Sequence, residues 1–90
     1  MEYCGPVIKK LSMDARFTLS NMAVEMGAKA GMIPPDETTL DWVGRHSPRR
    51  AFTPELPDPD AQYTKSLTFD VSNLSPYVAK PHYVDTGVPV

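Results

Sequence analysis

Four polar side chains form the part of this sequence most able to do chemistry. They are Asp14, Thr18, Asn21 and Glu25, in the run LSMDARFTLSNMAVEMGAKAGMIPP (residues 11–35). At about 100° per residue in an α-helix, the four positions fall within a wedge of roughly 60°. Apolar residues flank this line on both sides, so the polar face of the helix is narrow. A carboxylate and a carboxamide on a mostly buried helix are costly unless another part of the protein or a substrate meets them.

Asn21 and Glu25 are the pair to which we give most weight. Their spacing of four residues places both side chains on one face of a helix. A binding or catalytic role is one interpretation, and a structural bond from this pair to a neighbouring loop is the other. We expect Asp14 to favour the positive first turn of the helix, and Thr18 to bond the helix backbone or support the site from behind.

A long helix must position these side chains. Ser12 is a suitable N-cap, and Gly31 can supply a left-handed C-terminal cap before Pro34 and Pro35 prevent continuation. The apolar flanks predict that this helix is mostly buried. One flank is the stripe Ala15, Leu19, Met22 and Met26, and the other holds Phe17, Val24 and Ala28.

Two further helical segments are predicted around the long one. A short helical turn is expected over Gly5–Leu11, before the main helix. A second helix is expected to begin after Asp36 as its N-cap and to end at Gly44. The helical part of the chain would then cover residues 5–46.

The rest of the chain is expected to be extended. Residues 47–62 are a proline-rich and acidic linker by composition. Lys65–Val71 alternates between apolar and polar residues, which predicts a strand of a half-buried sheet. Residues 63–90 would therefore supply this strand and extended chain, with room for one more short strand. The fold class is α/β: two helices, a linker, and one or two strands.

Length and composition suggest a piece of a larger protein. The chain has 90 residues, and seven of its 10 prolines lie between Pro48 and Pro89. A chain this short buries only about 60–65% of its unfolded surface. We therefore expect residues 1–90 to be a partial domain of a larger α/β protein. The alternative is a small, irregular α+β domain that folds alone.

Charge and cysteine content narrow the class of protein. The formal net charge is −2, so nothing favours nucleic acid or an anionic membrane as a partner. No apolar run reaches the ~20 residues needed to span a bilayer, and no signal peptide is visible. A single cysteine, Cys4, excludes an internal disulfide, and the default location is cytoplasmic. The basic cluster Arg45, His46, Arg49 and Arg50 is interpreted as a solvated helix end in preference to a phosphate site.

Three stretches together resemble a known family. They are EYCGPVIKKLSM at the start, NMAVEMGA followed by AGMIPPDET in the middle, and DPDAQYTKSLTFDVSNLSPYVAKPH near the end. The chain resembles the large subunits of 3-isopropylmalate dehydratase, in the aconitase superfamily of iron–sulfur hydro-lyases. The resemblance covers nearly all residues. It implies a fragment of an aconitase-type three-layer α/β/α domain.

The resemblance also implies a function for the longer protein. That function is the interconversion of 2-isopropylmalate and 3-isopropylmalate by dehydration and rehydration, in leucine biosynthesis. The implied partners are the hydroxyacid substrate, a small dehydratase subunit and the remainder of the large subunit. A homoaconitase or a dimethylmalate dehydratase large subunit is an alternative. So is a noncatalytic remnant that acts as an interaction module.

The resemblance assigns the catalytic roles to Asn21 and Glu25. In the family these two residues lie beside the free iron of a 4Fe-4S cluster, where they hydrogen-bond or orient the bound water or hydroxyl. A cluster of this type takes three or four thiolates, and this chain has only Cys4. The ligand cysteines are therefore expected outside the chain, and Cys4 is expected to be a small buried thiol. The 90 residues alone are not expected to be active.

Overall fold

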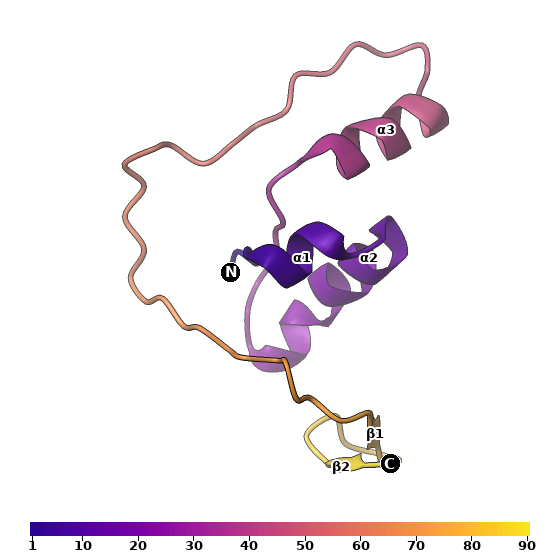
Figure 1. Ribbon diagram of the computed structural model, residues 1–90, viewed down its shortest axis with the longest axis vertical. Helices are drawn as coiled ribbons and strands as arrows, with labels where there is room; N and C mark the ends of the chain where they lie inside the picture. The colour runs from indigo at the N-terminus through magenta and orange to yellow at the C-terminus, as the bar shows by residue number, and fades with distance from the viewer.

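The computed structural model describes residues 1–90 and consists of a helical N-terminal half and a largely extended C-terminal half (Figure 1). A long coil leaves the last helix, runs away from the helices and returns to a small hairpin near the C-terminus. In chain order the elements are α1 (Pro6–Lys10), α2 (Met13–Met22), the 3₁₀ helix η1 (Ala23–Met26), α3 (Glu37–His46), β1 (Tyr77–Ala79) and β2 (Gly87–Pro89).

The two longer helices begin at the predicted caps. The hydroxyl of Ser12 accepts a hydrogen bond from the Ala15 N–H at 3.3 Å. The carboxylate of Asp36 accepts one from the Thr39 N–H at 3.2 Å. Each bond satisfies a backbone donor that the first turn of a helix leaves without a partner. Both N-cap predictions are therefore confirmed.

The predicted ends of these helices are wrong. Helix α2 stops at Met22, tightens into η1, and ends at Gly27, whose φ of 82° lies in the left-handed region. Gly27 is thus the C-terminal cap that was expected at Gly31. Helix α3 continues through Gly44 to His46, because a glycine inside a helix costs only about 1 kcal/mol.

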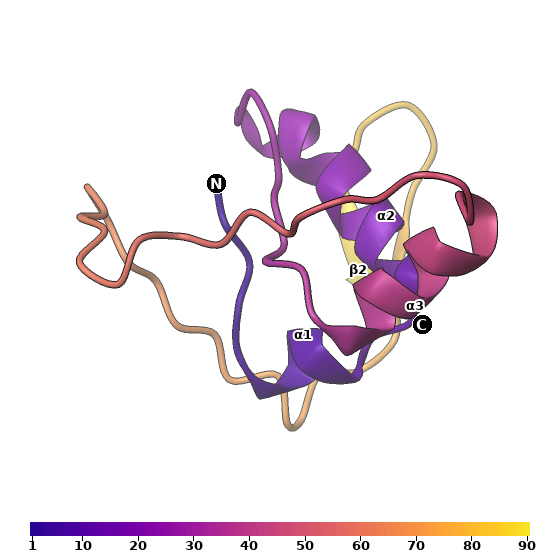
Figure 2. The ribbon, with the colours of Figure 1, turned by 90° about the horizontal axis from the view of Figure 1, so that it is seen from above.

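Gly31 has a packing role instead. A Cβ placed on Gly31 would lie 2.8 Å from the Ala23 Cβ and 2.9 Å from the Tyr3 Cε2. The start of the chain lies alongside this region, since the Tyr3 N–H donates to the Met32 carbonyl at 2.8 Å. Figure 2 shows the N-terminal segment running beside the chain between η1 and α3. The missing side chain of Gly31 lets these segments approach closely.

The sheet lies later in the chain than the predicted strand. Strands β1 and β2 pair antiparallel, with Tyr77 opposite Pro89 and Ala79 opposite Gly87. The expected strand at Lys65–Val71 has no strand hydrogen bonding in this structure. Residues 47–62 form neither a helix nor a strand.

The interior of the chain is small. Only Ala23 and Arg16 are buried. The apolar flanks of the helical region are open: Phe17 and Met22 are each 47% exposed, and Met26 is 67% exposed. The prediction of a mostly buried helix is therefore wrong within these 90 residues, which offer too little chain to cover it. None of the helices has the length and apolar character that a membrane span requires.

Candidate functional site

The structure leaves both predicted site residues open to solvent. Asn21 lies in the last turn of α2, and Glu25 lies in η1. Both residues are exposed. Neither side chain takes part in a hydrogen bond or an ion pair within the chain. The structural interpretation predicted a bond from this pair to a neighbouring loop, and no residue of this chain forms such a bond.

A change of helical winding separates the two side chains. In a continuous α-helix, residues four apart differ by about 40° around the axis and about 6 Å along it. The two steps from Ala23 to Glu25 lie in η1, where each step turns about 120° and rises about 2 Å. The offset therefore grows to about 80° and about 7 Å. Asn21 and Glu25 still face one side of the helical run, but less closely than predicted.

The other two polar residues of the line have local roles. The Thr18 hydroxyl donates to the Asp14 carbonyl at 3.0 Å, one helical turn back. This is the bond to the helix backbone that the sequence suggested. Asp14 is exposed in the first turn of α2, where the helix dipole favours a carboxylate.

Arg16 is the residue that sequence reasoning missed. Its side chain is 3% exposed and forms a two-point ion pair with Asp36, at 2.6 Å from Nη1 to Oδ1 and 2.8 Å from Nη2 to Oδ2. The remaining donors reach the Thr39 hydroxyl at 3.1 Å, the Lys9 carbonyl at 3.2 Å and the Leu11 carbonyl at 3.1 Å. A planar guanidinium with five N–H donors suits this arrangement.

The ion pair fixes the protonation of both groups. The hydrogen bonds from Arg16 lower the pKa of Asp36 from 3.8 to about 2, against the opposing effect of burial, with help from the Thr39 N–H. The hydrogen bond to Asp36 raises the pKa of Arg16 further above its already high value. Both groups are therefore charged throughout the physiological range.

The geometry makes Arg16 the residue that holds the helices together. It joins the end of α1, the middle of α2 and the N-cap of α3. The ring of Phe17 adds an edge-on contact with Trp42 of α3, at 5.1 Å between ring centroids. A lone arginine between apolar flanks was the available signal, because a charged group on such a face needs a carboxylate opposite it. Its partner, 20 residues later, could not be chosen from the sequence.

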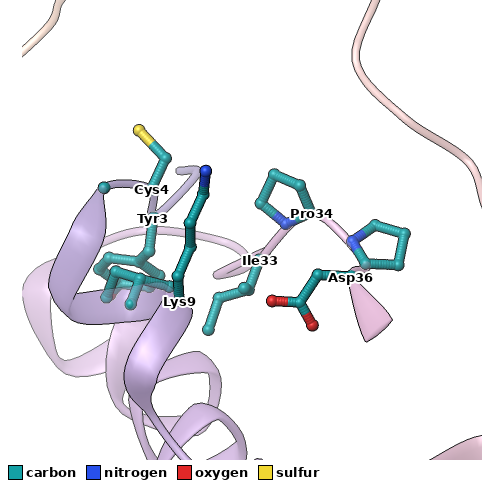
Figure 3. A pocket seen from close by; sticks show the side chains of 9 residues that line it. Tyr3, Cys4, Lys9, Ile33, Pro34 and Asp36 are labelled. Carbon is teal, nitrogen blue, oxygen red and sulfur yellow. The ribbon is translucent and has the colours of Figure 1, made fainter. Parts of the chain in front are cut away.

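A small pocket lies apart from Asn21 and Glu25. It has a volume of about 140 Å³ and lies between α1 and the segment before α3. Figure 3 shows Tyr3, Cys4 and Lys9 on one side, with Ile33, Pro34 and Asp36 on the other. Ligand pockets usually enclose about 300–1,000 Å³, and the Asp36 carboxylate is already bound by Arg16. This pocket is therefore a gap beside the ion pair, and it does not include the predicted site.

The basic cluster is a helix end in the structure. The guanidinium of Arg45 donates to the Asp41 carbonyl at 3.3 Å, and the His46 Nδ1 lies 2.7 Å from the Trp42 carbonyl. The His46 ring also stacks on Trp42, with 3.9 Å between centroids. Arg45 and His46 therefore lie in the last turn of α3, where both side chains contact helix carbonyls.

Comparison with known proteins identifies the family. The profile of the Aconitase family (aconitate hydratase) matches residues 1–90. The chain is 51% identical over 90 residues to the 3-isopropylmalate dehydratase large subunit 1 of Methanopyrus kandleri, covering all of this chain and 21% of that protein. It is 47% identical to the protein of the same name from Pyrococcus abyssi, again over all of this chain and 21% of the relative. The probable methanogen homoaconitase large subunit of Methanosarcina mazei is 44% identical over 90 residues, which are 100% of this chain and 23% of that protein.

The chain belongs to the aconitase family, and it spans about a fifth of the length of the curated relatives that it matches. The family implies an iron–sulfur cluster. The residues present do not fit one: the only thiol is Cys4, and no group of three or more His, Cys, Asp or Glu side chains could hold a metal ion. Cys4 is exposed, so the prediction that it is buried is wrong. The fold agrees with a part of an aconitase-family domain that combines helices with a small sheet.

Proposed function

We propose that this chain is a segment of the large subunit of a hydro-lyase that interconverts 2-isopropylmalate and 3-isopropylmalate. The observation that carries the proposal is the 51% identity, over all 90 residues, to a 3-isopropylmalate dehydratase large subunit. The proposal includes a small partner subunit, a cluster held by cysteines elsewhere in the large subunit, and a cytoplasmic location. It also includes a complete domain of three α/β/α layers, to which these helices and strands would contribute.

Asn21 and Glu25 are the proposed catalytic residues of this segment. Removing water from a hydroxyacid and adding it back requires that a proton move at the substrate and that the hydroxyl be held in place. A carboxylate at Glu25 can accept and return a proton, and a carboxamide at Asn21 can both donate to and accept from a hydroxyl. Two observations support this role: both side chains are exposed, and neither is used in bonds within the chain.

Homoaconitase is the second candidate for the parent enzyme. It is favoured by the relative from Methanosarcina mazei, which is 44% identical over the whole chain. Both activities act on hydroxyacids that differ in the group attached to the reacting carbons. Asn21 and Glu25 are proposed to act at the reacting hydroxyl and proton, which both kinds of substrate share, so the proposal for these residues is the same for both enzymes.

The test uses the intact large subunit, assembled with its small subunit and loaded with iron and sulfide. Absorbance of the carbon–carbon double bond decides between the two activities, because it rises as 2-isopropylmalate is dehydrated and falls as homoaconitate is hydrated. Glu25→Gln should lower kcat by about 10²–10⁴-fold, as expected when a positioned acid–base group is lost. Glu55→Gln, an exposed carboxylate in the coil, is the matched control. Turnover of Glu25→Gln within a factor of about two of the parent would remove Glu25 from the site.

A further inference from the structure

Lys65–Val71 has the side-chain pattern of a half-buried strand. Three large apolar side chains alternate with polar ones, so in an extended chain they lie on one face. That face is open in this structure: Leu67 is 63% exposed, Phe69 is 75% exposed and Val71 is 38% exposed. The other face carries Ser66, Thr68 and Asp70.

The backbone of the same segment is free to pair, except for the Val71 carbonyl, which accepts from the Leu74 N–H at 3.2 Å. From Tyr63 to Asp70 no backbone N–H or C=O takes part in a hydrogen bond within the chain. No proline lies between Pro59 and Pro76, so every residue of the segment keeps its donor. A row of available donors and acceptors combined with an alternating apolar face is what the edge of a sheet recognises. A flexible linker would also have free backbone groups, but it would not require apolar and polar side chains to alternate.

The segment is tethered before its first residue and lies away from α1, α2 and α3. Before it, the Tyr63 hydroxyl donates to the Glu2 carboxylate at 3.0 Å. After it comes β1, which pairs only with β2. Figure 1 shows the intervening orange stretch as an extended coil apart from α1, α2 and α3. The segment can therefore meet another polypeptide without unpacking the helices.

We propose that Lys65–Val71 adds as a strand to the edge of a sheet formed by the remainder of the large-subunit polypeptide, with Leu67, Phe69 and Val71 facing its core. This inference rests on the proposed function only in assigning the occupant. The length of the relatives supports that assignment: the matched segment is 21% of the Methanopyrus kandleri protein, which leaves about four-fifths of such a chain to supply the sheet. A helix could cover the apolar face, but it could not pair with the backbone.

Hydrogen–deuterium exchange with residue resolution tests the proposal, comparing the 90-residue chain with the intact large subunit. Amides of Lys65–Val71 should exchange at nearly the random-coil rate in the 90-residue chain. In the intact subunit, alternate amides should be protected by at least about 10²-fold, as expected for strand amides that open rarely. Unprotected amides in the intact subunit would overturn the proposal. Protection in the 90-residue chain alone, rising with concentration as a dimer forms, would also overturn it by making a second copy the occupant.

Two substitutions in the intact subunit test which face is buried. Phe69→Ser should raise the exchange rates of the neighbouring amides at least about tenfold, while Thr68→Ser should leave them within about threefold. If Phe69→Ser prevents folding, the protection of the unsubstituted subunit still decides the question. The readout does not depend on catalysis. Protected amides in an inactive subunit would refute the proposed function and leave the strand proposal standing. Unprotected amides in an active dehydratase would refute the strand proposal and leave the proposed function standing.

Discussion

Replacing Arg16 with methionine should separate α2 from α3. Breaking a buried ion pair by removing one member costs about 3–5 kcal/mol. The Asp36 side chain is 35% exposed, so water could solvate part of the carboxylate once Arg16 is gone. The free energy of unfolding should therefore fall by about 2–3 kcal/mol. Arg16→Lys keeps the charge but contacts the carboxylate at one point, and it loses bonds to the Lys9 and Leu11 carbonyls. Its expected loss is about 1–2 kcal/mol.

Trp42 reports on this change directly, because it contacts Phe17 across the same pair of helices. Urea unfolding can be followed by Trp42 fluorescence and by helical circular dichroism. The urea midpoint should be highest for the parent chain, lower for Arg16→Lys and lowest for Arg16→Met. Asp36→Asn keeps an acceptor for the Thr39 N–H and removes the charge. The loss in the Arg16→Met, Asp36→Asn double variant should fall short of the sum of the single losses by about 1–2 kcal/mol. Additive losses, or an unchanged midpoint in Arg16→Met, would refute the reasoning.

Three more perturbations follow from the local geometry. Because the pKa of Asp36 is lowered from 3.8 to about 2 in the folded chain, its contribution is complete above about pH 5 and is lost as the pH falls through 3.8 toward 2. Urea midpoints should therefore fall in this window for the parent chain and fall less for Asp36→Asn; equal slopes would contradict the assignment. Gly27→Ala should destabilise by about 1–2 kcal/mol, because the φ of 82° at Gly27 disfavours a Cβ. Gly44→Ala, in the interior of α3 with nothing within 4 Å of the added Cβ, should instead stabilise by about 0.5–1 kcal/mol. Thermal unfolding distinguishes these two outcomes, and a lower Tm for Gly44→Ala than for Gly27→Ala would be the contrary result.

Local signals were readable from the sequence. Ser12 and Asp36 could be recognised as N-caps because each side-chain oxygen accepts a hydrogen bond from a backbone N–H three residues later. Such a bond depends on the local sequence alone. The end of α2 was less readable, since Gly27 and Gly31 are both able to stop a helix. The choice depends on Gly31 lying against Ala23 and Tyr3, and this contact exists only in the folded chain.

Long-range features were beyond the sequence for a different reason. The pairing of Arg16 with Asp36 and of β1 with β2 depends on which segments meet, and alternation alone does not name a partner. The alternating residues Lys65–Val71 illustrate this, because the sheet forms between shorter segments after them. For the candidate site, the sequence identified Asn21 and Glu25 as polar residues on one face of a helix that it predicted to be mostly buried, whereas both are exposed in the structure. The sequence did not reveal that the helical run changes its winding between them.

The 3₁₀ turn that begins at Ala23 sets the position of the Glu25 carboxylate relative to Asn21. Rewinding Ala23–Met26 from 3₁₀ to α would swing this carboxylate by about 40° and draw it about 1 Å closer to Asn21 along the axis. The ion pair of Arg16 with Asp36, between the middle of α2 and the start of α3, does not involve this turn. The winding of this single turn therefore sets how closely an acid and an amide face the same side of the helical run.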